Sequence, residues 1–309
     1  MEETFPNTYK SLVNKDFIIE DDRDEYEELY AEYKRSINSV SELYLTILPT
    51  LDCNLRCWYC FEKHKKGTHL TTITANAIVE LIKKTLSEQP KIQAVHIELF
   101  GGEPLLYFKS EVYPLLHEIK KCTEERQRTV SFFFVTNSVC ILPDTYPLFQ
   151  ELHANFQISI DGYKEKHDKI KFIPNENKEG TYSHVINVIK GLTTKIDGIY
   201  INLRINYDDE TLIHMEELIS DLKDIDRRKI GIHLERIWQT SYKIKGDNEL
   251  LKSVIDNWQK NGFRVSYMNL SRRSYSCKAS KISQCAISYN GAVYKCTGRD
   301  FTSELKEEI

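Results

Sequence analysis

Six short apolar runs alternate with amphipathic segments, and this alternation constrains the fold more than any other feature of the chain. The runs lie at residues 43–48, 94–100, 130–135, 156–160, 199–205 and 230–237. Between them, apolar residues recur at helical spacing at 73–86, 112–122, 182–192 and 212–222. Strands that alternate with helices indicate parallel βα units with right-handed crossovers. The continuous apolar run from Phe132 to Val135 predicts a sheet that is covered on both faces. The pattern leaves an open six-stranded barrel and a doubly wound sheet as alternatives.

The first forty residues differ from the rest and are predicted to form a helical segment. Tyr26, Leu29, Tyr30 and Tyr33 recur at positions i, i+3, i+4 and i+7. This spacing places them on one side of an amphipathic helix, which we expect to lie on another surface.

The alternation stops after Trp238. A helical pattern follows at 249–260, and the Asn290-Gly291 pair between two short apolar runs predicts a β-hairpin. The chain is therefore predicted to have three parts: an N-terminal helical segment at 1–40, a βα domain at 41–240, and a C-terminal extension at 241–309.

Composition excludes several classes of protein. The 309 residues are 41% hydrophobic and 28% charged, which is typical of a folded globular chain. The net charge of −4 gives no indication of a nucleic-acid partner. The acidic, polar N-terminus does not resemble a signal peptide, and no apolar run is long enough for a transmembrane helix. We therefore expect a cytoplasmic protein with no membrane partner.

The eight cysteines are unevenly distributed. Cys122 and Cys140 stand alone and are predicted to be small buried apolar residues. The other six form one group near each end of the chain: Cys53, Cys57 and Cys60, and Cys277, Cys285 and Cys296. In a reducing compartment, grouped cysteines indicate a metal site rather than disulfide bonds.

The first group lies directly after the first predicted strand. Cys53, Cys57 and Cys60 fall within eight residues, so one loop can direct all three at a common centre. Thiolates favour zinc or iron–sulfur clusters. Zinc usually takes four protein ligands in a structural site, whereas a [4Fe–4S] cluster held by three cysteines keeps one iron open. We predict the cluster, with zinc or incidental thiols as the alternatives.

This cysteine spacing, with an aromatic residue before the third cysteine, resembles the radical SAM (S-adenosylmethionine) superfamily. The resemblance implies that Tyr59 lies against the adenine of the cofactor. A second match ends the second strand: Gly101, Gly102, Glu103 and Pro104 resemble the GGEP element of the family, which implies that the backbone and Glu103 hold the methionine amino group. Glycines permit close backbone approach, and a carboxylate suits an ammonium group.

Other strand ends match the family in order. Thr136, Asn137 and Ser159 resemble the polar positions that contact the ribose, and Arg204 resembles a partner of the methionine carboxylate. Leu234 lies where the family often makes backbone contacts to adenine. Ordinary turn residues and an ordinary ion pair are the alternatives for these positions.

The second cysteine group resembles the opening of the SPASM or twitch extension of peptide- and protein-modifying members. Thirteen residues separate Cys277 from Gly291, and four separate Gly291 from Cys296. The resemblance implies that Cys277 and Cys296 begin the ligation of a second iron–sulfur cluster. The further cysteines of a complete SPASM domain do not follow, so a structural role for the two residues stays open. The expected fold is α/β, a partial (β/α)6 TIM-like barrel with a short, incomplete cysteine-containing extension.

The resemblance also implies a function. A [4Fe–4S] cluster would cleave S-adenosylmethionine reductively, and the resulting 5′-deoxyadenosyl radical would take a hydrogen atom from the substrate. We expect a peptide or protein substrate, with a peptide maturase favoured, and an electron donor such as flavodoxin or ferredoxin. An enzyme similar to anaerobic sulfatase maturases is one alternative. A catalytically inactive, truncated homologue that acts as a binding or assembly partner is the other.

Overall fold

The computed structural model describes residues 2–15, 17–175, 177–237, 239, 247–267, 277–298 and 301. Trp238, where the alternation was predicted to stop, lies outside them. The elements in chain order are α1 (Pro6–Val13), α2 (Glu25–Asn38), β1 (Glu42–Leu48), α3 (Thr72–Glu88), β2 (Ala94–Leu99), η1 (Phe108–Val112), α4 (Tyr113–Glu124), β3 (Thr129–Thr136), η2 (Pro143–Thr145), α5 (Tyr146–Glu151), β4 (Asn155–Ile160), α6 (Lys164–Ile170), α7 (Tyr182–Lys195), β5 (Ile201–Tyr207), α8 (Asp209–Ile213), α9 (Met215–Asp221), β6 (Ile230–Arg236), α10 (Asp247–Lys260), β7 (Arg264–Tyr267), η3 (Lys278–Ser280), β8 (Gln284–Ser288) and β9 (Val293–Tyr294).

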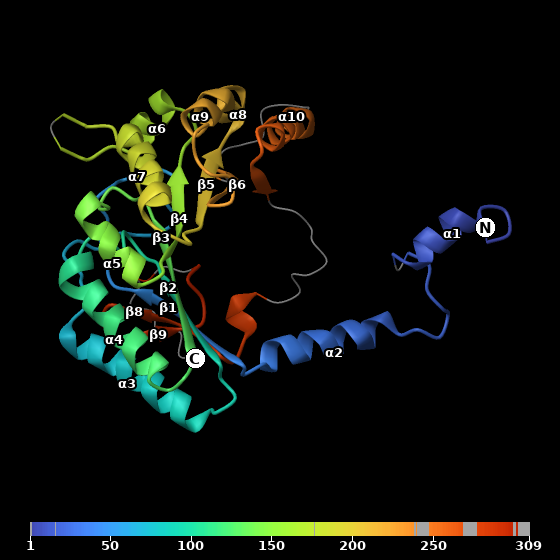
Figure 1. Cartoon of the computed structure of the whole chain (residues 1–309), viewed down its shortest axis with the longest axis horizontal. Coiled ribbons are helices and arrows are strands. Elements are labelled where there is room, and N and C mark those ends of the chain that lie inside the picture. The colour runs from blue at the N-terminus through green and yellow to red at the C-terminus, as the bar shows by residue number, and fades with distance from the viewer. Residues whose placement is uncertain are drawn as a thin grey trace.

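The strand order separates the two arrangements that the sequence left open. The described sheet has nine strands in the order β7-β6-β5-β4-β3-β2-β1-β8-β9, and β1 to β7 run parallel to their neighbours. A doubly wound sheet reverses its order at a switch point, and β1 to β7 show no reversal. Right-handed crossovers between successive neighbours place their helices on the same side. Figure 1 shows α3, α4, α5 and α7 along one side of the strands. The predicted partial barrel is therefore confirmed.

The two faces of the sheet are not equally covered. Along β2, β3 and β4, buried residues alternate with partly buried ones. Phe132 and Phe134 belong to the buried core, whereas Phe133 and Val135 line cavities. The prediction of a sheet covered on both faces is therefore wrong. Aromatic residues fill both faces of β3, but only one face packs against helices.

The structure contains elements that the sequence pattern did not predict. The short helices α5 and α6 precede and follow β4, and β7 extends the sheet beyond β6. The helix predicted at 212–222 is two helices, α8 and α9, which meet at His214. Their shortness explains the difference, because five to seven residues show too few turns for a clear helical period.

The N-terminal helices form, but they do not pack on the barrel. The Asp24 side chain accepts a hydrogen bond from the Glu27 backbone N–H and so caps α2. Neither α1 nor α2 has a buried residue, and Tyr26 is 70% exposed. Figure 1 shows α2 projecting away from the sheet, with α1 further out. The helix predicted from this spacing is confirmed, and none of its residues is buried in the described structure.

The C-terminal extension is part of the sheet. Strand β8 pairs in parallel with β1, and β9 pairs antiparallel with β8. Between them, the Ser288 backbone N–H donates to Ala292, and Gly291 has a φ of +83°, which a residue without a Cβ adopts most readily. The hairpin predicted from Asn290-Gly291 is confirmed. None of the helices in the described residues has the length and apolar character needed to cross a membrane.

Candidate active site

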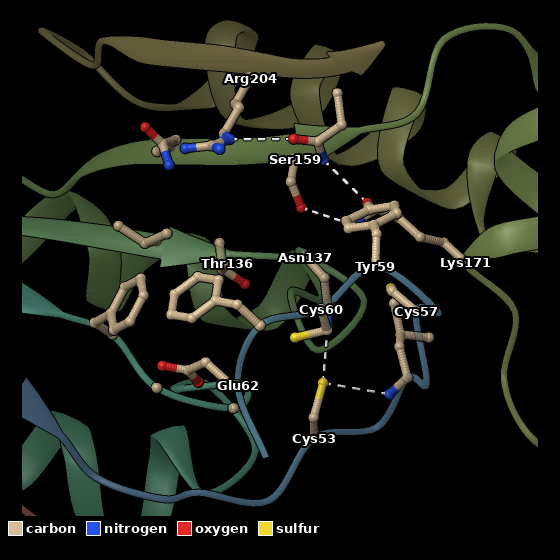
Figure 2. Close-up of a pocket in the computed structure, with 18 of the residues that line it drawn as sticks. Cys53, Cys57, Tyr59, Cys60, Glu62, Thr136, Asn137, Ser159, Lys171 and Arg204 are labelled. Carbon is tan, nitrogen blue, oxygen red and sulfur yellow. Dashed lines mark hydrogen bonds between the residues drawn. The ribbon is translucent and has the colours of Figure 1, made fainter. Parts of the chain in front are cut away.

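A cavity of about 200 Å³ lies where the cysteine loop meets the carboxyl ends of β3, β4 and β5. This end of a βα barrel is where active sites are found. Figure 2 shows its lining. Ten of the predicted site residues line it: Cys53, Cys57, Tyr59, Cys60, Gly101, Gly102, Thr136, Asn137, Ser159 and Arg204. The other five do not line it: Glu103, Pro104, Leu234, Cys277 and Cys296.

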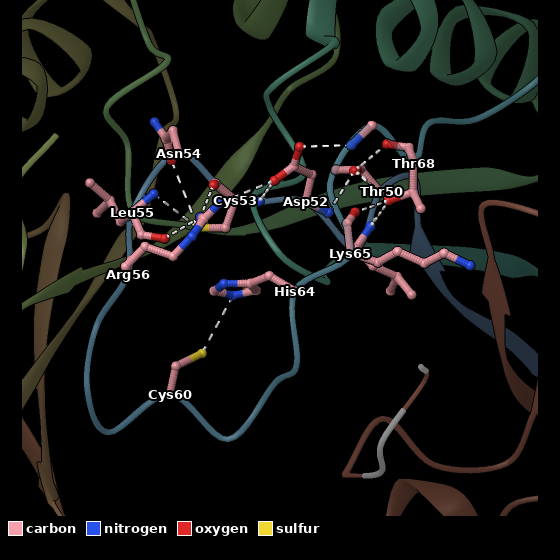
Figure 3. A network of polar contacts seen from close by, with 12 residues as sticks. Thr50, Asp52, Cys53, Asn54, Leu55, Arg56, Cys60, His64, Lys65 and Thr68 are labelled. Atoms are coloured by element: carbon pink, nitrogen blue, oxygen red, sulfur yellow. Dashed lines mark hydrogen bonds and ion pairs between the residues drawn. The ribbon is translucent and has the colours of Figure 1, made fainter. Parts of the chain in front are cut away.

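The loop that carries the cysteines is shaped by its own polar side chains (Figure 3). The Thr50 hydroxyl donates to the Thr68 carbonyl at 2.5 Å, and the Leu51 backbone N–H donates to the Thr68 hydroxyl at 2.9 Å. The Asp52 carboxylate accepts from the backbone N–H groups of Cys53, at 2.8 Å, and Gly67, at 2.9 Å. These bonds close the loop after β1, so the cysteines are held at the end of the first strand.

Gly101 and Gly102 pack against this loop. A Cβ at Gly101 would lie 2.6 Å from the Thr50 carbonyl oxygen, and one at Gly102 would lie 2.1 Å from that of Asp52. The Gly102 and Glu103 backbone N–H groups donate to the same two carbonyls. The pair of glycines therefore permits close approach between two loops, in addition to the approach to a ligand that the sequence suggested.

The three cysteines share the cavity, and their sulfurs have different neighbours. Cys53 is buried, and its sulfur accepts a hydrogen bond from the Leu55 backbone N–H at 3.4 Å. The Cys60 sulfur lies 3.7 Å from His64 Nε2. In the described part of the chain, no three histidine, cysteine or acidic side chains form a ready-made metal site.

The chemistry of the donor set fits a cluster. Burial raises the pKa of Cys53 to about 12, and it also raises the pKa values of Cys57 and Cys60. Without a metal the thiols are therefore neutral. A cationic iron centre stabilises thiolates, so its binding would release their protons.

Tyr59 fastens the cysteine loop to two strands. Its hydroxyl donates to Asp161 Oδ1 at 2.6 Å and accepts from Asn206 Nδ2 at 3.0 Å. Asp161 follows β4 and is completely buried, and Asn206 lies on β5. Burial, followed by the Asp161 charge, raises the pKa of Tyr59, so the hydroxyl keeps its proton. Tyr59 also belongs to the cavity lining.

Glu103 is used within the protein. Its carboxylate accepts from the Thr136 hydroxyl at 2.7 Å and from the backbone N–H groups of Asn137, at 2.8 Å, and Leu105, at 3.0 Å. The side chain is completely buried, and burial raises its pKa despite these three bonds. The carboxylate thus ties the loop after β2 to the end of β3.

Lys171 is a cavity residue that the sequence analysis missed. It lies just after α6, is 4% exposed, and donates to the Ser159 hydroxyl at 2.8 Å. Burial disfavours its charge, but the negative charge of Asp161, together with that of the three cysteine sulfurs when they are deprotonated, outweighs this effect and raises its pKa. Lys171 is therefore a buried cation beside the cysteines. Its segment holds four lysines within eight residues, so nothing in the sequence distinguished this one.

Glu62 is a second missed residue, directly after the cysteine motif. Among the described residues, it is the only acidic one in the cavity lining. Burial raises its pKa to about 7. Its Oε1 atom is buried, and no described residue hydrogen-bonds to it. The sequence gave no sign of this role, because the motif ends at Cys60.

The remaining predicted residues are placed differently. Arg204 lines the cavity and donates to Asn206 at 3.2 Å, whereas Leu234 is a core residue of β6. In the extension, Cys277 is exposed, and the Cys296 sulfur accepts from the Gly298 backbone N–H at 3.2 Å. Cys285 packs against the core cluster that fills the helix side of the sheet.

The model of the radical SAM superfamily matches residues 47–222 of this chain, from β1 to just after α9. The chain belongs to the radical SAM superfamily. The matched segment carries all three cavity cysteines and Lys171. Membership indicates an enzyme.

Two relatives illustrate the range of the family. A cysteine-type anaerobic sulfatase-maturating enzyme of Clostridium novyi is 29% identical over 143 residues, which are 45% of this chain and 37% of the relative. The chain thus aligns with little more than a third of that protein. A probable GTP 3′,8-cyclase of Methanococcus aeolicus is 22% identical over 287 residues, 84% of this chain and 86% of the relative.

Solved structures share the fold. A structure of anSMEcpe with bound AdoMet and the Cp18Cys peptide superposes with a TM-score of 0.65 at 21% identity, covering 84% of this chain and 74% of that one. The structure of Streptococcus suis SuiB bound to the precursor peptide SuiA superposes with a TM-score of 0.61 at 16% identity. The match covers 96% of this chain and 72% of that one.

Proposed function

We propose that this protein binds a [4Fe–4S] cluster and S-adenosylmethionine and modifies a peptide substrate. The observation that carries the proposal is the cavity, in which one loop supplies Cys53, Cys57 and Cys60 beside the buried cation Lys171. When bound, the cluster would supply the electron that cleaves S-adenosylmethionine to methionine and the 5′-deoxyadenosyl radical.

The other residues would hold and orient the cofactor. Tyr59, fixed by Asp161 and Asn206, offers its ring to the adenine. Ser159 and the polar end of β3 suit the ribose hydroxyls. Lys171 and Arg204 are the two candidates for the methionine carboxylate, and the buried position of Lys171 favours it because a desolvated charge pair is stronger.

A peptide is favoured as substrate because two structures with this fold hold peptides. Sulfatase maturation is the second candidate, supported by the Clostridium novyi relative. We further propose the division 1–40, 41–240 and 241–309, and flavodoxin or ferredoxin as the electron donor. A second cluster at Cys277 and Cys296 is the alternative to a single cluster.

The test is reductive cleavage of S-adenosylmethionine by anaerobically reconstituted protein. With dithionite as reductant, we expect 5′-deoxyadenosine and methionine from the wild type and none from a Cys53→Ala, Cys57→Ala, Cys60→Ala variant. Cys122→Ala, which changes a lone core cysteine, should keep the activity.

Three other results would redirect the proposal. Iron uptake without cleavage would favour an inactive binding partner. A new product from added GTP would place the chain with the cyclases. Absence of iron in the wild type would overturn the proposal.

A further inference from the structure

Glu103 and Glu62 are two of the carboxylates at or near the cavity, and their surroundings are opposite. Glu103, which the family pattern pairs with an ammonium group, already accepts three hydrogen bonds within the protein. The Oε1 atom of Glu62 is buried, and it accepts no hydrogen bond from any described residue. A buried carboxylate oxygen without a donor costs free energy, which a ligand can recover by supplying the donor.

Glu62 shares the cavity wall with two aromatic side chains. Phe61 and Phe100 both line the cavity, and their rings stack with centroids 6.4 Å apart. The face of an aromatic ring attracts a cation, as a carboxylate does. An ammonium or guanidinium group is therefore the chemistry that this wall fits best.

The positive side chains of the cavity do not supply that cation. Lys171 donates to Ser159, Arg204 to Asn206, and Arg236 to Asp209. Figure 2 shows Glu62 and Lys171 well apart, on either side of the cysteines. The cavity thus carries a negative end and a positive end, and a cation at Glu62 would not face Lys171 directly.

We propose that Glu62 binds a cationic nitrogen that enters the cavity against Phe61 and Phe100. The inference rests on the proposed function, because that function provides the two sources of such a group. One source is the methionine ammonium of S-adenosylmethionine. The other is a lysine or arginine side chain of the peptide substrate. In the first case, Glu62 performs the role that the sequence pattern had assigned to Glu103, and in the second it recognises the substrate.

The test compares reconstituted wild type with Glu62→Gln, which keeps the shape of the side chain and removes its charge. Glu118→Gln is the matched control, because Glu118 is an exposed residue of α4 outside the cavity. One arm measures the Kd of S-adenosylmethionine by equilibrium dialysis. The other measures, by ligand-observed NMR in saturating S-adenosylmethionine, the binding of acetyl-Gly-Lys-Gly-amide against its norleucine analogue.

We expect Glu62→Gln to weaken binding in one arm by about 10- to 100-fold, the effect of losing one charge-assisted hydrogen bond. Loss in the first arm identifies the cofactor ammonium, and loss confined to the lysine peptide identifies the substrate. Phe61→Leu, at a side chain that is half exposed, should weaken the same ligand by a few-fold. Glu118→Gln should change neither value.

Values for Glu62→Gln within twofold of wild type in both arms, at equal iron content, would overturn the inference. So would equal weakening of the lysine and norleucine peptides, because only one of them is cationic. These results are distinguishable from failure of the proposed function, which appears in the wild type as absence of iron or of cofactor cleavage.

Discussion

The two groups of three cysteines have similar sequence signals and different surroundings. Cys53, Cys57 and Cys60 line one cavity with a buried cation. Cys277 is exposed, and Cys285 packs on the core cluster at the helix side of the sheet. Cysteine spacing therefore predicts a shared site best where one loop carries all three residues. Where the cysteines belong to different strands and loops, as in the extension, the fold can direct them to different surroundings.

Counting bound iron is the most direct test of whether the two cysteine groups differ. Removing Cys53, Cys57 and Cys60 together should abolish iron binding after anaerobic reconstitution, whereas Cys277→Ala with Cys296→Ala should keep about four irons per chain. Iron and sulfide analysis gives both values. A wild type with about eight irons that falls to about four in the second variant would show that the two groups are equivalent.

The second largest difference is expected in how tightly the backbone packs around a glycine in the cavity loops and in the extension. Gly102→Ala places a Cβ against the Asp52 carbonyl, so we expect about 1–3 kcal/mol lower stability and reduced iron uptake. In the extension, a Cβ at Gly298 would lie 3.5 Å from the Cys296 sulfur, an ordinary contact. Gly298→Ala should stay within about 0.5 kcal/mol of wild type in urea unfolding. Equal losses would contradict the idea that the cavity loops are the tighter region.

Removing one tyrosine hydroxyl should also affect the stability of the two regions differently. Tyr59→Phe removes the bond to the buried Asp161 carboxylate and should cost about 1–2 kcal/mol in urea unfolding of the protein without cluster. Tyr289→Phe in the extension is the control, because no hydrogen bond to its hydroxyl is seen among the described residues. Its effect should be within about 0.5 kcal/mol. If Tyr59→Phe had the same free energy of unfolding as wild type, the Tyr59 hydroxyl would not hold the cysteine loop in place.

The smallest expected effect is a pH dependence. His167 is completely buried, its Nδ1 accepts from the Asp161 backbone N–H, and burial lowers its pKa well below the usual 6.5. Below about pH 6.5 the unfolded chain binds the proton more readily, so stability should fall as pH falls, by at most about 1.4 kcal/mol per pH unit.

The measurement compares urea unfolding of wild type and His167→Gln at pH 7.5 and 5.5. The variant should lose this part of the pH dependence. The difference between the two proteins is the relevant value, because buried carboxyl groups such as Glu103 contribute with the opposite sign. Parallel pH profiles would contradict the expectation.

The sequence predicted the cavity where its signals were local. The cysteine loop, Gly101-Gly102 and the ends of β3 and β4 meet because the carboxyl ends of neighbouring parallel strands meet at one edge. It could not predict Lys171, which follows α6 and reaches the site by its contact with Ser159 of β4. It also could not separate Glu62 from Glu103, since their roles depend on donors from other segments.

The remaining differences have the same origin. The aromatic spacing in α2 predicted a helix correctly. A helical period does not show, however, whether another part of the chain packs against its apolar side. The apolar run in β3 predicted a strand correctly, and one of its faces lines cavities instead of packing against helices.

The pairing of β8 with β1 has a consequence for how the chain acquires its structure. Tyr44 of the first strand pairs with Gln284, 240 residues later. During synthesis β1 can pair with β2 early, but its other edge stays open until the extension has emerged. An open edge invites pairing with other chains, and such distant contacts form slowly. The cysteine loop follows this strand directly, so its final support is among the last contacts to form. We therefore expect cluster insertion to follow completion of the chain rather than to guide its folding.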